Sequence, residues 1–158
     1  MKYFKYELWE AMNSEDSTEE EKASEQWEIN DKQYFNEFIQ LESKVSKELF
    51  QVFKQIRFHD FVLKNYSITQ YESDDPKQIE VTITVSDDFS EEWELKYKDV
   101  RKFAVQVQYE SNYDMGDWGY SEIFVEVDGV ISHEILLSTG TTILIHFTDI
   151  TLSKISKR

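Results

Sequence analysis

The sequence predicts an α+β fold in which N-terminal helices pack on one face of a C-terminal antiparallel meander sheet of about six to seven strands. Residues 1–57 contain neither glycine nor proline, and their apolar residues recur every three or four positions, the spacing of one helix face. From Phe58 onward the apolar period becomes two, the period of a β-strand. A run of helices followed by a run of strands is typical of segregated α+β layers, and not of alternating βαβ units.

The length and composition predict one domain over residues 1–158, with a helical layer at 1–57 and the sheet at 58–152. Hydrophobic residues make up 40% of the chain and aromatic residues 15%, which is enough bulky material to close one core. We therefore expect the domain to fold without a disulfide or a structural metal.

Three helices are expected, in order, within residues 1–57. The first is short and lies around Leu8, Trp9 and Met12. The second covers residues 18–27 behind an N-cap at Ser17 or Thr18, because three glutamates follow and acidic residues stabilise the first turn. The third begins at Asn30 or Asp31 and carries one apolar stripe, formed by Phe35, Phe38, Leu41, Val45, Leu49, Val52 and Ile56 and widened by Tyr34, Ile39, Phe50 and Phe53.

Seven short sets of alternating apolar residues predict the strands of the sheet. They centre on residues 62–68, 79–85, 93–97, 103–109, 123–127, 135–137 and 143–147. Turn residues, among them Asp128-Gly129 and Thr139-Gly140, separate most of the sets. Polar residues alternate with the apolar ones, which favours a sheet with one face against the helices and the other in solvent.

The charge of the chain limits its partners. The formal net charge is −15, from 32 acidic and 17 basic residues, and residues 1–30 alone contribute −6. A polyanion is repelled by such a surface, so we expect no nucleic acid and no anionic membrane as a partner. The acidic residues either form an ordinary solvated face or attract a basic protein.

Several classes of function lack their residues or motifs here. There is no cysteine, which excludes disulfides, thiolate metal sites and cysteine nucleophiles. The four glycines show no phosphate-binding spacing, and no HExxH, GxSxG or EF-hand motif occurs, so no cofactor and no catalytic residue is predicted. No signal-peptide pattern and no apolar run of membrane-spanning length is present, so the expected location is cytoplasmic.

The C-terminal hairpin offers a candidate metal site. A two-residue turn at Thr139-Gly140 sets His133 opposite His146, where two imidazoles could share a divalent metal with Glu134 as a further ligand. A three-residue turn would shift the register by one position and separate the rings. The alternative interpretation is two unrelated, partly buried histidines.

The loop at residues 111–120 offers a candidate partner-binding site, because it combines aromatic and acidic residues between two strands. Its candidate contacts are Tyr113, Asp114, Asp117, Trp118 and Tyr120. A calcium site formed by its acidic residues is the less favoured interpretation, since the spacing matches no calcium loop.

His59-Asp60 lies where the helices meet the first strand. An imidazole there can cap a helix or bond a carboxylate, and a structural role is favoured over general-base chemistry because no nucleophile stands nearby in sequence.

Short segments spread over nearly the whole chain resemble a bacterial protein family. The segments are Met1-Lys2-Tyr3-Phe4, the stretch from Glu7 to Met12, Phe58-His59-Asp60 and the stretch from His133 to Gly140. The family is found mostly in Firmicutes and is defined only as a domain of unknown function. The resemblance implies a small cytosolic α+β domain, and it transfers no activity and no site residue.

Two functions remain as hypotheses. The first is a non-enzymatic protein-interaction domain, such as an inhibitor of the immunity or antitoxin type that binds a basic partner. The second is a metal- or small-ligand-binding domain, with a hydrolase as one form of it, that uses histidines and carboxylates on the sheet. A flat acidic face with protruding aromatics would favour the first, and converging imidazoles and carboxylates in a pocket would favour the second.

Overall fold

The computed structural model of the protein describes residues 1–72, 78–87, 91–108 and 115–155. It has N-terminal helices and a C-terminal antiparallel sheet, which confirms the α+β class, and the sheet has eight strands. The helical segments are α1 (Tyr6–Met12), α2 (Ser17–Phe38), η1 (Ile39–Ser43), α3 (Lys47–Gln55) and η2 (Val127–Gly129). The strands are β1 (Phe61–Tyr71), β2 (Gln78–Ser86), β3 (Glu92–Lys98), β4 (Lys102–Gln106), β5 (Asp117–Val125), β6 (Ile131–Leu137), β7 (Thr142–Phe147) and β8 (Asp149–Ile155).

The strand order is β4-β7-β6-β5-β1-β2-β3-β8, with every pair antiparallel. Strands β1 to β3 and β5 to β7 each form a meander, and the two sets are joined through a short contact of β1 with β5. Strand β4 pairs with β7 and β8 with β3, so the three connections β3–β4, β4–β5 and β7–β8 leave the simple meander order. Strand β8 is the one that the apolar alternation did not predict.

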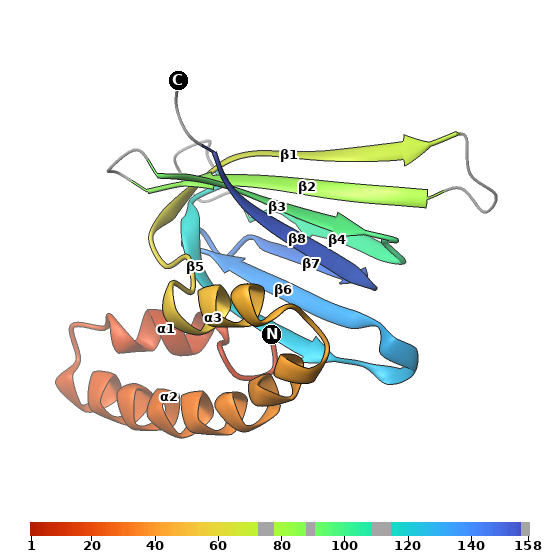
Figure 1. Ribbon diagram of the computed structural model, residues 1–158. Helices are drawn as coiled ribbons and strands as arrows, with labels where there is room; N and C mark the ends of the chain where they lie inside the picture. Colours follow the sequence, from red (N-terminus) through yellow and green to blue (C-terminus); the bar gives the residue numbers. More distant parts are fainter. Residues whose placement is uncertain (73–77, 88–90, 109–114, 156–158) are drawn as a thin grey trace.

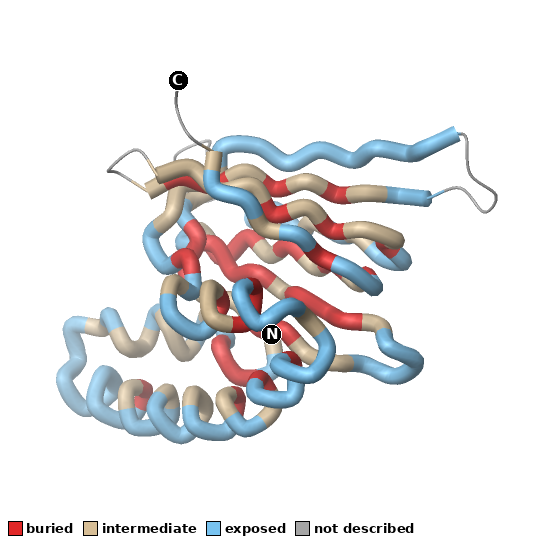
Figure 2. The backbone as a smooth tube through the Cα atoms, in the orientation of Figure 1, coloured by how far each residue is buried: buried red, intermediate tan, exposed pale blue. Residues whose placement is uncertain are grey.

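The sheet folds on itself, so that its two halves meet across the core (Figure 1). The Tyr97 hydroxyl of β3 lies 2.9 Å from Nδ1 of His133 on β6, and the Tyr66 ring of β1 lies 5.9 Å from the ring of Phe103 on β4. The helices lie together at the β5–β6 side of the molecule (Figure 1). Buried segments accordingly concentrate on the central strands and where helices meet them, whereas most of β1 is exposed (Figure 2).

The helices divide at other positions than expected. Helix α2 runs unbroken through Asn30, whose side chain donates to the Tyr3 carbonyl oxygen at 2.9 Å instead of capping a helix. Its N-cap is Asp16, which accepts from the backbone N–H groups of Thr18 and Glu19. The actual break comes after η1, where the Ser46 hydroxyl caps α3 at Leu49 N–H. No helix among the described residues is long and apolar enough to cross a membrane.

Most of the predicted apolar stripe does reach the core, despite this break. Phe38, Leu41, Leu49 and Phe53 are buried, while Ile39 stays 47% exposed. The buried rings pack in pairs, such as Phe38 stacked on Phe50 at 5.1 Å. Helix η1 lets the chain turn between α2 and α3 while Leu41 remains in the core.

A buried carboxylate holds the N-terminal segment to the sheet. Glu122 on β5 is 1% exposed, and its two oxygens accept from the backbone N–H groups of Lys2, Tyr3 and Phe4 at 2.6 to 2.7 Å. Three charge-assisted hydrogen bonds compensate for burial of the charge. Phe4 is thereby held beneath α2, where it forms part of the site described below.

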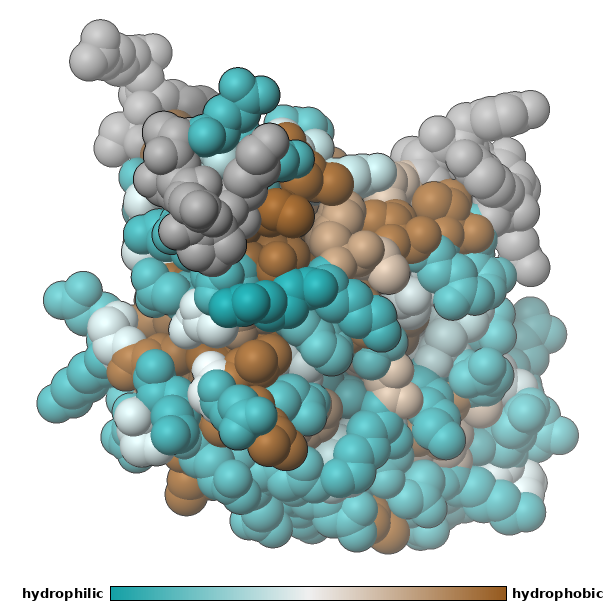
Figure 3. Space-filling view, turned by 90° about the vertical axis from the view of Figure 1, so that its right-hand side faces the viewer, coloured by the Kyte–Doolittle hydropathy of each residue, from teal (hydrophilic) through white to brown (hydrophobic). Residues whose placement is uncertain are grey.

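The surface differs between the two layers. The outward face of α2 is exposed and carries Glu20, Glu21, Glu25 and Glu28. The sheet layer has exposed apolar side chains instead, among them Ile68 on β1 and Ile79 on β2, which are 56% and 38% exposed. Figure 3 shows hydrophobic residues gathered on the upper part of one face, with hydrophilic residues over most of the remainder.

Candidate functional site

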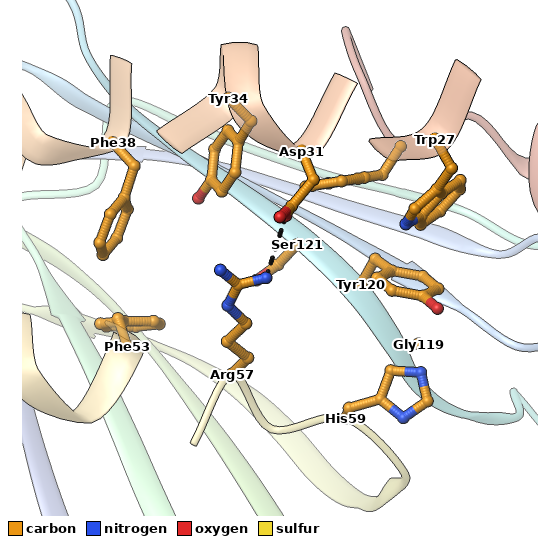
Figure 4. A pocket seen from close by; sticks show the side chains of 11 residues that line it. Trp27, Asp31, Tyr34, Phe38, Phe53, Arg57, His59, Gly119, Tyr120 and Ser121 are labelled. Carbon is orange, nitrogen blue, oxygen red and sulfur yellow. Dashed lines mark hydrogen bonds and ion pairs between the residues drawn. The ribbon is translucent and has the colours of Figure 1, made fainter. Parts of the chain in front are cut away.

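A cavity of about 190 Å³ lies between α2, the end of α3 and strand β5 (Figure 4). Most of its wall is aromatic, and four polar or charged side chains complete it. The lining residues are Phe4, Trp27, Asp31, Tyr34, Phe38, Phe53, Arg57, His59, Gly119, Tyr120 and Ser121. Concave, mostly apolar sites with a few convergent polar groups are the usual form of a binding site.

Helix α2 supplies one wall of the pocket through residues at helical spacing. Trp27, Asp31, Tyr34 and Phe38 are three or four positions apart and therefore lie on one face. The opposite wall includes Tyr120 of β5, whose ring centroid lies 4.5 Å from that of Trp27. Gly119 is buried beside Tyr120. Its lack of a side chain leaves room for Trp9 of α1, since a Cβ placed there would lie 2.4 Å from the ring of Trp9.

The turn after α3 supplies the remaining wall and has an unusual backbone. Arg57, Phe58 and Asp60 all have positive φ, at 52°, 54° and 64°, a conformation that non-glycine residues seldom adopt. Phe58 is fully buried against Trp118, and the Asp60 N–H donates to the Trp118 carbonyl oxygen at 2.8 Å. The packing of Phe58 holds this backbone in place, so that Arg57 and His59 line the pocket.

An ion pair bridges the two walls. The Arg57 guanidinium points across the pocket toward α2 (Figure 4), and its Nη1 donates to Asp31 Oδ1 at 3.1 Å. Both side chains are partly exposed, by 50% for Arg57 and 40% for Asp31. Exposed ion pairs stabilise proteins by at most about 1 kcal/mol, so this contact can open at little cost.

The other charged groups make the Tyr120 side of the pocket negative. Burial raises the pKa of the Tyr120 phenol, and the negative charges of Asp60 and Asp31 raise it further. The His59 ring lies 4.9 Å from the Tyr120 ring, and its Nδ1 lies 2.9 Å from Asp60 Oδ2. Of the two structural roles that the sequence allows for His59, capping a helix or bonding a carboxylate, the structure has the second.

His59, Asp60 and Ser121 have the residue types of a hydrolytic triad, but they are not assembled as one. In the described part of the chain no hydrogen bond joins His59 to Ser121, and a triad requires its base to bond the nucleophile. Ser121 instead lies behind the Asp31–Arg57 pair (Figure 4). The geometry suits binding better than acyl transfer.

The predicted partner-binding loop contributes to this site only in part. Tyr120 lines the pocket, Asp117 is exposed outside it, and Trp118 is fully buried in the core, so Trp118 is not an interface residue. Tyr113 and Asp114 lie outside the described residues. Trp118 turns inward because a register irregularity between Trp118 and Tyr120 changes which face each residue occupies.

The predicted register of the β6–β7 hairpin was wrong by one residue. The loop has three residues, with Gly140 at φ 83° and Leu137 N–H bonded to the Thr141 carbonyl oxygen, so His133 faces Ile145 and His146 faces Ser132. His133 is buried on the inner face, while His146 and Glu134 lie on the other. The structure therefore does not bring His133 and His146 together, and the described residues contain no group of three or more acidic or histidine side chains placed to hold a metal.

Sequence reasoning did not identify Trp27, Asp31 and Arg57 as site residues. In the sequence, Trp27 falls in the helix expected at residues 18–27, and Asp31 is one of two candidate N-caps of the next helix. The four-residue spacing of Trp27 and Asp31 on an uninterrupted α2 indicates that both lie on one helix face. The position of Arg57 could not be predicted in this way, because it depends on the left-handed turn that follows α3.

Comparison of the sequence with protein-family models and with curated proteins finds no match. The resemblance to the Firmicute family stays a prediction.

Proposed function

We propose that the protein is a non-enzymatic interaction domain that binds a basic protein through the acidic face of α2 and the adjoining aromatic pocket. The observation that carries this proposal is that one helix contributes both features: α2 lines the pocket with one face and exposes Glu21, Glu25 and Glu28 on its outward face. An acidic surface speeds encounter with a basic partner, and an aromatic pocket supplies the anchor that gives affinity.

The size of the pocket also favours a partner side chain. Sites for whole small molecules usually enclose about 300 to 1,000 Å³. At about 190 Å³ this cavity suits one side chain of a larger partner or a compact ligand. An inhibitor of the immunity or antitoxin type is the kind of acidic protein that would use such a surface.

The second candidate is a domain that binds a small organic ligand in the same pocket. The observation that favours it is the meeting of Arg57, His59 and Ser121 with the aromatic wall, which would orient a small polar ligand.

A pull-down separates the two candidates. The tagged protein is incubated with lysate of its native host at low salt and again at high salt, and captured proteins are identified by mass spectrometry. We expect a stoichiometric basic protein that is released at high salt, because screening weakens attraction between exposed charges.

The matched variants test where that partner binds. Replacing Glu21, Glu25 and Glu28 by glutamine should abolish capture, whereas the same replacement at the exposed residues Glu42, Glu48 and Glu72 should not. Equal capture by both variants would contradict the α2 surface as the binding face. An empty pull-down combined with a small molecule that copurifies with the protein would favour the second candidate.

A further inference from the structure

The Asp31–Arg57 pair places a guanidinium of the chain itself inside the aromatic pocket. Arg57 reaches Asp31 from the opposite wall, between the Phe38–Phe53 side and the Trp27–Tyr120 side (Figure 4). One of its N–H groups bonds Asp31 Oδ1 at 3.1 Å, and no other hydrogen bond from its side chain occurs in the described structure. The pocket thus already accommodates the chemical group that is most typical of a basic protein surface.

The surroundings favour a cation even when Arg57 is removed. Asp31 and Asp60 place two carboxylates near Tyr120, and the Trp27 and Tyr120 rings form an apolar wall beside them. Arg57 is the one permanent cation among the lining residues. Withdrawal of Arg57 would leave an acidic, aromatic-walled site without a counter-ion.

We propose that the pocket binds an arginine side chain of the partner by exchange, with the incoming guanidinium taking the place of Arg57 on Asp31. This inference rests on the proposed function, since it names the partner group that enters the same pocket. Exchange keeps the number of charged hydrogen bonds constant and frees the exposed Arg57 side chain to solvent. In the unbound protein Arg57 acts as an internal competitor that keeps the Asp31 carboxylate paired.

The test is a titration with N-acetyl-arginine amide, followed through the indole N–H resonance of Trp27 in NMR spectra. N-acetyl-citrulline amide serves as the uncharged isostere. Arg57→Ala should bind the arginine derivative about fivefold more tightly than the unmodified protein, because an exposed ion pair no longer competes. Asp31→Asn should bind it at least about tenfold more weakly, since a charged hydrogen bond is lost.

Matched controls come from a second exposed pair, in which Arg101 Nη2 bonds Asp99 Oδ2 at 2.7 Å outside the pocket. Arg101→Ala and Asp99→Asn change the net charge equally and should leave the affinity unchanged. Weaker binding by Arg57→Ala than by the unmodified protein, or equal binding of the arginine and citrulline derivatives, would overturn the exchange.

The outcome is separable from that of the pull-down. If Arg57→Ala does not bind the arginine derivative, the proposed exchange is wrong. This holds even if the variant with glutamine at positions 21, 25 and 28 loses its protein partner. If the variants bind the arginine derivative in the expected order of affinities, the exchange is supported even when the pull-down captures no protein. An empty pull-down then counts only against the proposed protein partner.

Discussion

At the scale of single residues, the least expected feature is a polar group in the middle of the core. His133 is fully buried among the rings of Phe53, Tyr97 and Trp118. Its Nδ1 bonds the Tyr97 hydroxyl, while its Nε2 and the Trp118 indole nitrogen have no hydrogen-bond partner in the described structure. Burial lowers the pKa of His133 from 6.5 to about 3, so the folded protein holds it neutral.

This depressed pKa predicts a pH dependence of stability. Unfolded His133 gains a proton near pH 6.5 and the folded form only near pH 3, so the unfolded state binds the extra proton between these values. The folded state is therefore fully favoured above pH 6.5 and loses about 1.4 kcal/mol for each unit as the pH falls toward 3.

Urea unfolding of the unmodified protein and of His133→Gln at pH 7.5, 6.0 and 4.5 measures this contribution. Glutamine does not titrate and can still accept from the Tyr97 hydroxyl, so its curve reports the other groups alone. Below pH 6.5, the unfolding free energy of the unmodified protein should fall relative to that of His133→Gln by about 1.4 kcal/mol for each pH unit. Parallel curves would show that His133 is accessible to protons in the folded state.

At the scale of elements, α1 approaches the sheet closely at two glycines, with the Tyr6 ring near Gly140 and the Trp9 ring at Gly119. The ring of Trp9 lies against Gly119 of β5 and meets the Tyr120 ring edge-on at 5.1 Å. A side chain at position 119 would meet two Trp9 ring carbons at 2.4 Å and the Leu136 carbonyl oxygen at 3.1 Å. This glycine is required for space, because a Cβ there would displace α1.

Gly119→Ala should therefore lower the unfolding free energy by about 1 to 3 kcal/mol, the usual cost of overpacking. The measurement is a double-mutant cycle with Trp9→Ala, read by urea unfolding. Removal of the Trp9 ring relieves the main clash, so Gly119→Ala should cost much less in that background. Additive costs in the double variant would mean that the Leu136 carbonyl, and not the Trp9 ring, limits the site.

At the scale of the whole molecule, charge is the dominant property. A net charge of −15 destabilises a compact state through self-repulsion. The acidic face of α2 belongs to the helical layer. Seven salt bridges of the described residues, apart from the His59–Asp60 contact, neutralise only some of the acids. The free energy of this repulsion is screened by added salt.

The protein should accordingly become more stable between low salt and about 0.3 M sodium chloride, where the Debye length falls well below 10 Å. The urea midpoint at pH 7.5 measures the gain. The variant with glutamine at positions 21, 25 and 28 should gain less, because it has fewer repelling charges to screen. An unchanged or lower midpoint in salt would indicate that attractive pairs outweigh the repulsion.

The sequence by itself determined the class of the fold, most of the strands and the core residues of α3, because helical and strand periods are local properties that burial on one face imposes. It also determined the acidic character of the α2 surface. It did not determine where the long helical region breaks, since the caps at Asp16 and Ser46 compete with equally suitable residues such as Ser17 and Asn30. The sequence also did not predict strand β8. Its residues are mostly exposed and alternate only weakly, so its strand conformation depends on its pairing with β3.

Only the tertiary structure decided the candidate site. A single extra residue in the β6–β7 loop separates His133 from His146, and a register irregularity in β5 buries Trp118 while leaving Tyr120 in the pocket. The pocket itself joins residues from position 4 to position 121, brought together by the left-handed turn at Arg57 and by the carboxylate that holds Phe4. Such contacts depend on register and on long-range packing, in which a shift of one residue moves a side chain to the opposite face.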